Sequence, residues 1–207
     1  MREIIGIRRA GEGALRVLAD MFTDDTLPPR AEDETTDATI IFADIESFSD
    51  LVAQHGDETA SRVLDALDAA VDDAISATRC RVVKRLGDGV MIASDDPGDG
   101  VSTAVVLPLA FTEQMAGEPY TLRLRVGAHR GTVRRRGEDL IGYHVNVAAR
   151  VAEQARGGST LVTGALLDSV VLAQRLQVRP QGHLVAKGVP ERPPLFRLVS
   201  DVRSPAA

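Results

Sequence analysis

Cysteine is almost absent from the sequence, and this absence excludes two ways of stabilising a chain. Cys80 is the single cysteine among 207 residues, and it stands in an apolar, strand-like pattern. One cysteine can build neither a disulfide framework nor a cysteine-based zinc site. With 44% apolar residues, the chain is instead long and apolar enough to fold around one sizeable hydrophobic core.

The sequence has no excess of positive charge, since 30 acidic residues outnumber 24 basic ones. The formal net charge is −6 and the isoelectric point is about 5.3. A nucleic acid or an anionic membrane as partner needs a net basic face, so we expect neither, while a small anionic ligand stays compatible with locally concentrated positive charge. The apolar segment nearest the N-terminus is interrupted by Arg8, Arg9 and Glu12, and it reads as neither a signal peptide nor a membrane span. We therefore expect a cytoplasmic protein.

Lysine and asparagine are nearly absent from the sequence. Of the 24 basic residues 22 are arginine, so Lys84 and Lys187 are the only lysines, and Asn146 is the only asparagine. A coding bias toward arginine accounts for these counts without any function. The alternative is that the three positions need a compact ammonium or a carboxamide, which a guanidinium does not replace.

Alternating strand and helix patterns predict an α+β fold. Residues 1–37 read as a helical segment followed by an acidic linker with prolines, residues 38–200 as the folded domain and residues 201–207 as a tail. The domain begins with a strand, a helix, two strands, a helix and a strand, at 38–43, 57–75, 81–86, 90–93, 101–115 and 120–128. This order is that of a ferredoxin-like βαββαβ core. A helix at 142–154, a helix near 164–172 and strands at 159–162, 184–186 and 195–199 add a C-terminal αβ extension, and we expect residues 131–136 to pair back against 120–128.

The hairpin at residues 81–93 is the most informative stretch. Lys84 lies in its first strand, and Asp88 lies at the tip of its turn, Gly87-Asp88-Gly89. An aspartate at a hairpin tip most often bonds only its own backbone, so the pattern alone does not define a site. The acidic turn at 95–100 lacks the ligand spacing of a calcium loop and reads as a solvated connection.

Common catalytic motifs are missing from the sequence. There is no GxxxxGK[ST] phosphate loop, no GxGxxG after a strand, no GxSxG and no HExxH. The four histidines have no spacing typical of metal ligands, and we assign them no role: His55, His129, His144 and His183. Asn146 and Arg150 share one face of a predicted helix, but two polar residues on one face are usually only surface.

Five motifs in a fixed order carry a resemblance to a known family. They are FADIESF with Asp44, KRLGDGVM with Lys84 and Asp88, LRLRVGAHRG, GYHVNVAAR with Asn146 and Arg150, and AKGVPE with Lys187. Together they resemble the catalytic domain of class III nucleotidyl cyclases, in its shorter-armed bacterial subgroup, from about Thr39 to Val199. Each motif is weak alone, but both lysines and the only asparagine fall on motif positions.

The resemblance implies an adenylate cyclase, a phosphorus–oxygen lyase. Such an enzyme converts ATP into 3′,5′-cyclic AMP and pyrophosphate by in-line attack of the 3′-hydroxyl on the α-phosphate. Two divalent ions, Mg²⁺ or Mn²⁺, serve each active site, and they need carboxylates held close together. The matching metal ligands are Asp44 and Asp88, with the carbonyl of Ile45.

The resemblance also assigns the substrate-binding residues. The backbone N–H groups from Glu46 to Ser49, those of Phe48 and Ser49 included, begin a helix and suit a triphosphate. Arg150 matches the residue that meets charge developing on the α-phosphate, Asn146 the one that orients the ribose, and Lys187 the one that holds the terminal phosphates.

The base should be read by Lys84 and Asp139. Adenine offers an acceptor at N1 and a donor at its amino group, which a lysine and an aspartate complement, whereas guanine presents the opposite pattern. In this family the metal aspartates and the base-reading residues of one site come from different subunits. We therefore expect a head-to-tail homodimer with two composite active sites, in which Asp88 serves one site and Lys84 the other.

Two other functions fit parts of the pattern. One is a catalytically inactive, nucleotide-binding cyclase-homology module with a regulatory task, although none of the expected catalytic residue types is missing. The other is a diguanylate cyclase, which needs a GG[DE]EF turn where this chain has LGDGV. Product analysis with ATP or GTP distinguishes all three.

Overall fold

The computed structural model describes residues 34–173 and 176–200, and the expected helix at 2–22 and tail at 201–207 lie outside them. Its strands are β1 (Thr35–Ile45), β2 (Arg81–Arg85), β3 (Gly89–Ser94), β4 (Leu124–Arg136), β5 (Asp139–Ile141), β6 (Ser159–Thr163), β7 (Leu176–His183) and β8 (Pro194–Ser200). Its helices are α2 (Phe48–Ile75), α3 (Pro97–Gln114), α4 (Tyr143–Gln154) and α5 (Gly164–Leu167). The α+β class is confirmed.

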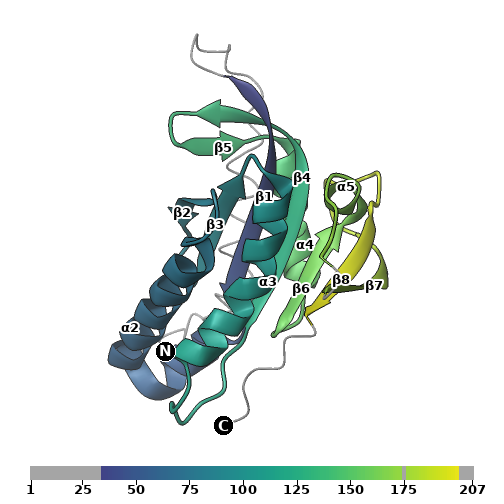
Figure 1. Cartoon of the computed structure of the whole chain (residues 1–207). Helices are drawn as coiled ribbons and strands as arrows, with labels where there is room; N and C mark the ends of the chain where they lie inside the picture. The colour runs from purple at the N-terminus through teal and green to yellow at the C-terminus, as the bar shows by residue number, and fades with distance from the viewer. Residues whose placement is uncertain (1–33, 174–175, 201–207) are drawn as a thin grey trace, which may run out of the picture.

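One mixed sheet organises the described residues. Its strand order is β2-β3-β1-β4-β6-β8-β7, and β5 pairs with the end of β4. The pairs among the first four strands are antiparallel, as the ferredoxin-like plan requires, and β4 and β6 are parallel. Figure 1 shows β7 and β8 at one side of the sheet and β5 above β2 at the other.

Helices lie on both faces of the sheet because the strands are apolar on both faces. Ile41, Ala43 and Ile45 of β1 pack with the inner residues of α2 and α3, which lie in front of the sheet in Figure 1. Ile40 and Phe42 point the other way and pack under α4. The period of two along a strand therefore places Asp44 on the α4 face.

Helix α2 contains the break that the sequence predicts. Gly56 has φ 78° and ψ 178°, which interrupts the helical backbone between Phe48 and Ile75. A φ of this sign suits glycine, which has no Cβ to clash. Beyond the break, Val63, Leu67 and Val71 recur at helical spacing and are buried against the sheet.

Helix α3 begins earlier than expected, so the reading of residues 95–100 as a solvated connection is wrong. The side chain of Asp96 accepts hydrogen bonds from the N–H groups of Gly98 (2.8 Å) and Asp99 (3.0 Å). Pro97 occupies the first turn, where its missing N–H is tolerated. The acidic run is therefore the capped start of a helix.

The expected hairpin between residues 120–128 and 131–136 is also wrong. Residues 124–128 and 131–136 belong to the single strand β4, which begins at Leu124 and pairs with β1 from Thr35↔Arg134 to Ile45↔Leu124. Gly131 leaves no space for a side chain, since a Cβ there would lie 2.3 Å from the ring of His144. This glycine marks close helix packing on a strand rather than a turn.

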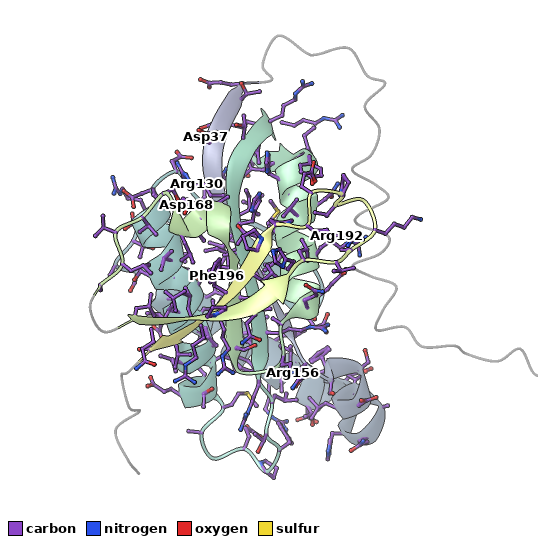
Figure 2. The ribbon with its side chains drawn as sticks, turned by 90° about the vertical axis from the view of Figure 1, so that its right-hand side faces the viewer. Asp37, Arg130, Arg156, Asp168, Arg192 and Phe196 are labelled. Carbon is purple, nitrogen blue, oxygen red and sulfur yellow. The ribbon has the colours of Figure 1, made fainter. Side chains whose placement is uncertain are left out.

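The C-terminal extension differs in detail from the expectation. Strands β6 and β8 are confirmed, whereas α5 ends at Leu167 and residues 184–186 form only an isolated bridge between Ala186 and Val189. Strand β7, which lies at the sheet edge and contains Pro180, was not predicted. Figure 2 shows this extension face on, with Phe196 of β8 near its centre.

Candidate active site

Asp44 and Asp88 are brought together where β1 ends. Asp44 is opposite Gly89 in the β1–β3 register, and the N–H of Ile45 donates to the carbonyl of Asp88 at 3.2 Å. A Cβ on Gly89 would lie 2.8 Å from the carbonyl oxygen of Ala43, so only glycine allows this close approach. The carboxylate at the hairpin tip therefore lies beside that of Asp44, and Asp88 is half-buried.

The two carboxylates are insufficiently neutralised by their surroundings. Burial raises the pKa of Asp44 even though the Arg125 guanidinium lowers it. Burial, together with the charge of Asp44, raises the pKa of Asp88 to about 6. A bound cation reduces the repulsion between paired carboxylates of this kind and favours their ionised forms.

The donor set fits a divalent ion of the Mg²⁺ or Mn²⁺ type, which prefers oxygen ligands and keeps positions for substrate phosphates. Within residues 34–173 and 176–200, no group of three or more His, Cys, Asp and Glu side chains is arranged to hold a metal. Asp44, Asp88 and the Ile45 carbonyl would thus provide part of a coordination shell. Other oxygens have to complete it.

Arg125 belongs to this site, and the sequence reading missed it. Its Nε donates to Oδ2 of Asp44 at 2.7 Å, and its Nη2 contacts the same oxygen. On sequence, Arg125 was only a polar position in an alternating strand. The β1–β4 register, which sets Asp44 opposite Arg125, is the information that was lacking.

The start of α2 lies directly after β1. Ser47 has φ 61°, and no side chain caps the helix, so the N–H groups of Phe48 and Ser49 stand at its first turn. Glu46 does not contribute its N–H, because it is donated to the carbonyl of Arg123 at 3.0 Å. The expected phosphate-binding run is therefore shorter by one residue at its beginning.

Glu46 has a structural task instead. Its Oε1 accepts the N–H of Gly157 at 3.1 Å in the loop between α4 and β6, which Arg156 marks in Figure 2. This contact ties the β1–α2 connection to the end of α4.

Lys84 and Asp139 meet as the base-reading hypothesis requires. The Lys84 Nζ lies 2.8 Å from Oδ2 of Asp139, with 22% and 37% of the two side chains exposed. Oδ1 of Asp139 accepts the N–H of Leu140, which orients the carboxylate. Arg81 also donates a hydrogen bond to the carbonyl of Glu138. These contacts hold β2 to the β4–β5 arm, which comprises residues 134–141.

Helix α4 places Asn146 and Arg150 one turn apart. Asn146 is half-buried, and Arg150 Nη1 contacts both oxygens of Glu153, at 2.7 and 2.8 Å. Glu153 was not singled out from the sequence, although the i, i+3 spacing to Arg150 was readable.

Lys187 is exposed in the turn that the Ala186–Val189 bridge closes. The connection that carries it is held to α4 by a hydrogen bond from the Tyr143 hydroxyl to Glu191.

Two histidines without an expected role form a hydrogen-bonded chain, in which His129 is buried and His144 is half-buried. His129 lies 2.7 Å from the Thr163 hydroxyl through Nδ1 and 2.8 Å from Nδ1 of His144 through Nε2. Burial is the main reason that the pKa of His129 is lowered to about 4, and His144 adds to it. The chain links β4, β6 and the first turn of α4.

The lowered pKa of His129 predicts that the folded protein loses stability in acid. Its pKa in the folded protein lies below the ordinary 6.5, so its contribution is complete above pH 6.5 and is lost as the pH falls toward 4. The loss amounts to roughly 3 kcal/mol. Urea unfolding across this range should show a shallower pH dependence for His129→Gln than for the parent. The control His183→Gln, on exposed β7, should keep the parental slope, and identical slopes for all three proteins would contradict the assignment.

The fold and the paired carboxylates are typical of domains that bind nucleoside triphosphates with divalent ions. The chain belongs to the adenylate and guanylate cyclase catalytic domain family, whose model matches residues 31–196. The family resemblance inferred from the five motifs is thereby confirmed.

Curated relatives are similar to this chain over part of their own length. An adenylate cyclase of Streptomyces coelicolor is 34% identical over 130 residues, which are 63% of this chain and 33% of that protein. The receptor-type adenylate cyclase ESAG 4 of Trypanosoma brucei brucei is 31% identical over 229 residues, covering 89% of this chain and 18% of that protein. The chain thus spans a third or less of the length of these two relatives.

Solved structures agree with the fold. The adenylyl cyclase CyaB of P. aeruginosa superimposes with a TM-score of 0.71 at 20% identity, covering 83% of this chain and 98% of that one. An adenylate cyclase of Trypanosoma brucei, described in its monomeric state, has a TM-score of 0.70 at 31% identity, covering 86% and 95%. Of the helices in residues 34–173 and 176–200, none is both long and apolar enough to cross a membrane.

Proposed function

We propose that this domain is an adenylate cyclase that forms 3′,5′-cyclic AMP and pyrophosphate from ATP. The observation that carries the proposal is the buried Asp44–Asp88 pair beside the start of α2. Related chains named adenylate cyclase support the choice of reaction.

When bound, divalent ions (Mg²⁺ or Mn²⁺) would lower the pKa of the attacking hydroxyl and neutralise the departing phosphates. Asp44, Asp88 and the Ile45 carbonyl would hold them. Arg125, which already binds Asp44, adds positive charge next to the phosphates. The first-turn N–H groups of Phe48 and Ser49 then donate hydrogen bonds to a phosphate oxygen at the helix start.

The remaining groups act on the ribose and on the phosphates. The 3′-oxygen forms a bond to the α-phosphorus, the bond from that phosphorus to the bridging oxygen breaks, and the hydroxyl proton is released. Arg150 meets the charge that develops on the α-phosphate, Asn146 orients the ribose, and Lys187 holds the pyrophosphate end.

The active species in this proposal is a head-to-tail homodimer. Lys84 and Asp139 read adenine at one site while Asp44 and Asp88 of the same chain serve the other. An incompletely covered part of the sheet supports this arrangement. On the sheet face that carries α4, the helix packs on β1, β4, β5 and β6, and Val83 and Leu86 beside β3 remain only partly buried. A second chain is the partner that would cover it.

Exchanging the base-reading pair should change the nucleotide preference. Lys84→Glu combined with Asp139→Ser replaces a donor and an acceptor by an acceptor and a small hydroxyl, which suits guanine. We expect the ratio of kcat/KM for ATP over GTP to fall by about tenfold or more. Lys84→Glu alone is a poor test, since it brings two carboxylates together. If the double variant kept the parental ratio, the base-reading role would be wrong.

Product analysis tests the function directly. The purified chain is incubated with ATP or GTP in Mg²⁺ or Mn²⁺, and the products are separated by chromatography. We expect cyclic AMP and pyrophosphate in equal amounts. Nucleotide binding without product would indicate the inactive module instead.

A further inference from the structure

Arg150 is held by one nitrogen only. Its Nη1 contacts both carboxylate oxygens of Glu153, at 2.7 and 2.8 Å. Its Nε and Nη2 have no hydrogen bond to the part of the chain that the structure describes. A guanidinium binds a phosphate best through two parallel N–H groups. The edge formed by Nε and Nη2 therefore remains for a ligand while Glu153 fixes the other end.

The position of this ion pair is set by close packing. A Cβ on Gly127 would lie 2.1 Å from the backbone nitrogen of Ala152, so the last turn of α4 lies directly on β4. Gly127 is two residues from Arg125, which binds Asp44. The charge of Glu153 is felt at Asp44, whose pKa it raises by less than burial does. Glu153 thus lies at the carboxylate end of the sheet.

A stabilising surface ion pair would look different. The side chains of Arg150 and Glu153 are only 18% and 30% exposed, whereas the helical pair Arg62–Glu58 is 51% and 94% exposed with a separation of 3.7 Å. A third carboxylate near Asp44 and Asp88 also adds repulsion to a pair whose charge Arg125 offsets only in part. Both facts favour a task in the site over general helix stabilisation.

We propose that Glu153 is the positioning residue of Arg150, anchoring its guanidinium so that the Nε–Nη2 edge is presented to the phosphate undergoing transfer. This inference rests on the proposed cyclase function. It goes beyond that function by adding a carboxylate that binds neither metal nor nucleotide. Without the anchor, Arg150 samples several rotamers, and the fraction of productive complexes falls.

The test is a comparison of kcat and KM for ATP in Mn²⁺ among the parent, Glu153→Ala, Glu153→Gln and the control Glu58→Ala. We expect Glu153→Ala to lower kcat by roughly 10- to 100-fold with KM within about twofold, because misplacement of a group that acts in the transition state costs rate rather than binding. Glu153→Gln keeps the shape and one acceptor oxygen, so its loss should be smaller. Glu58→Ala should match the parent.

A double-mutant comparison separates positioning from a structural effect. If Glu153 acts through Arg150, adding Glu153→Ala to Arg150→Ala should cost no further activity. A full additional loss, or a Glu153→Ala enzyme with the parental kcat, would overturn the inference. Should Glu153→Ala fail to fold, Glu153→Gln decides the question by the same comparison. A parent protein that forms no cyclic AMP refutes the proposed function instead.

Discussion

Replacing Asp44 with asparagine is expected to abolish cyclic AMP formation, with a loss of at least about 10³-fold in kcat. The carboxamide still accepts a hydrogen bond from Arg125, which binds Oδ2 of Asp44 in the parent. It carries no charge, however, so the pair with Asp88 can no longer attract divalent ions. The measurement is product formation at saturating Mn²⁺ and ATP, which reveals even weak residual activity.

The asparagine variant is preferable to alanine because alanine leaves the half-buried Arg125 without its partner. Asparagine also removes the charge that helps to raise the pKa of Asp88, so the metal-free protein should unfold at the parental temperature or above. Asp50→Asn, in the exposed first turn of α2, is the matched control. Undiminished activity of Asp44→Asn in Mn²⁺ would refute the metal assignment.

Replacing Arg150 with alanine should lower kcat by roughly 10³- to 10⁵-fold, the scale on which arginines act in phosphoryl transfer. The KM for ATP should change little, because the interaction grows as charge develops on the α-phosphate. Arg150→Lys keeps the charge but not the fork, and it should recover only part of the rate. A raised KM with the parental kcat would instead indicate a contact made equally in the ground state.

The two inactive variants together test the composite site. If Asp44 and Arg150 of one site come from different chains, a heterodimer of Asp44→Asn with Arg150→Ala contains one intact site and one doubly defective site. Random exchange of subunits then restores about a quarter of the parental activity. If both residues serve the same chain, which the closeness of Glu153 to Asp44 makes worth testing, mixing restores nothing.

The sequence was informative where the determinants are local. The hairpin at 81–93, the break at Gly56 and helix α4 follow from turn residues and apolar spacing, and all three are present. Strand β4 was divided wrongly because a glycine in a strand has two meanings, a turn or close packing. Only the position of His144 over Gly131 decides between them.

The site was predictable in its residue types but not in its contacts. The family motifs indicated Asp44 and Asp88. Their burial and the contact with Arg125 depend on the pairing of β1 with β3 and β4, strands that lie far from β1 in sequence. Glu153 could have been found from its helical spacing to Arg150. The His129–His144 chain could not, because it joins a strand to a helix through a packing contact.

If Lys84 and Asp139 read adenine, their ion pair links nucleotide selection to the position of the β4–β5 arm. The same ion pair that would have to open for adenine also fastens the β4–β5 arm over β2. Energetic linkage is reciprocal, so a nucleotide that competes for these side chains loosens the arm, and any neighbouring domain or regulator that shifts the arm alters the affinity for adenine. The arm is therefore a place where a signal from outside the domain would change the affinity for the nucleotide without touching the Asp44–Asp88 pair.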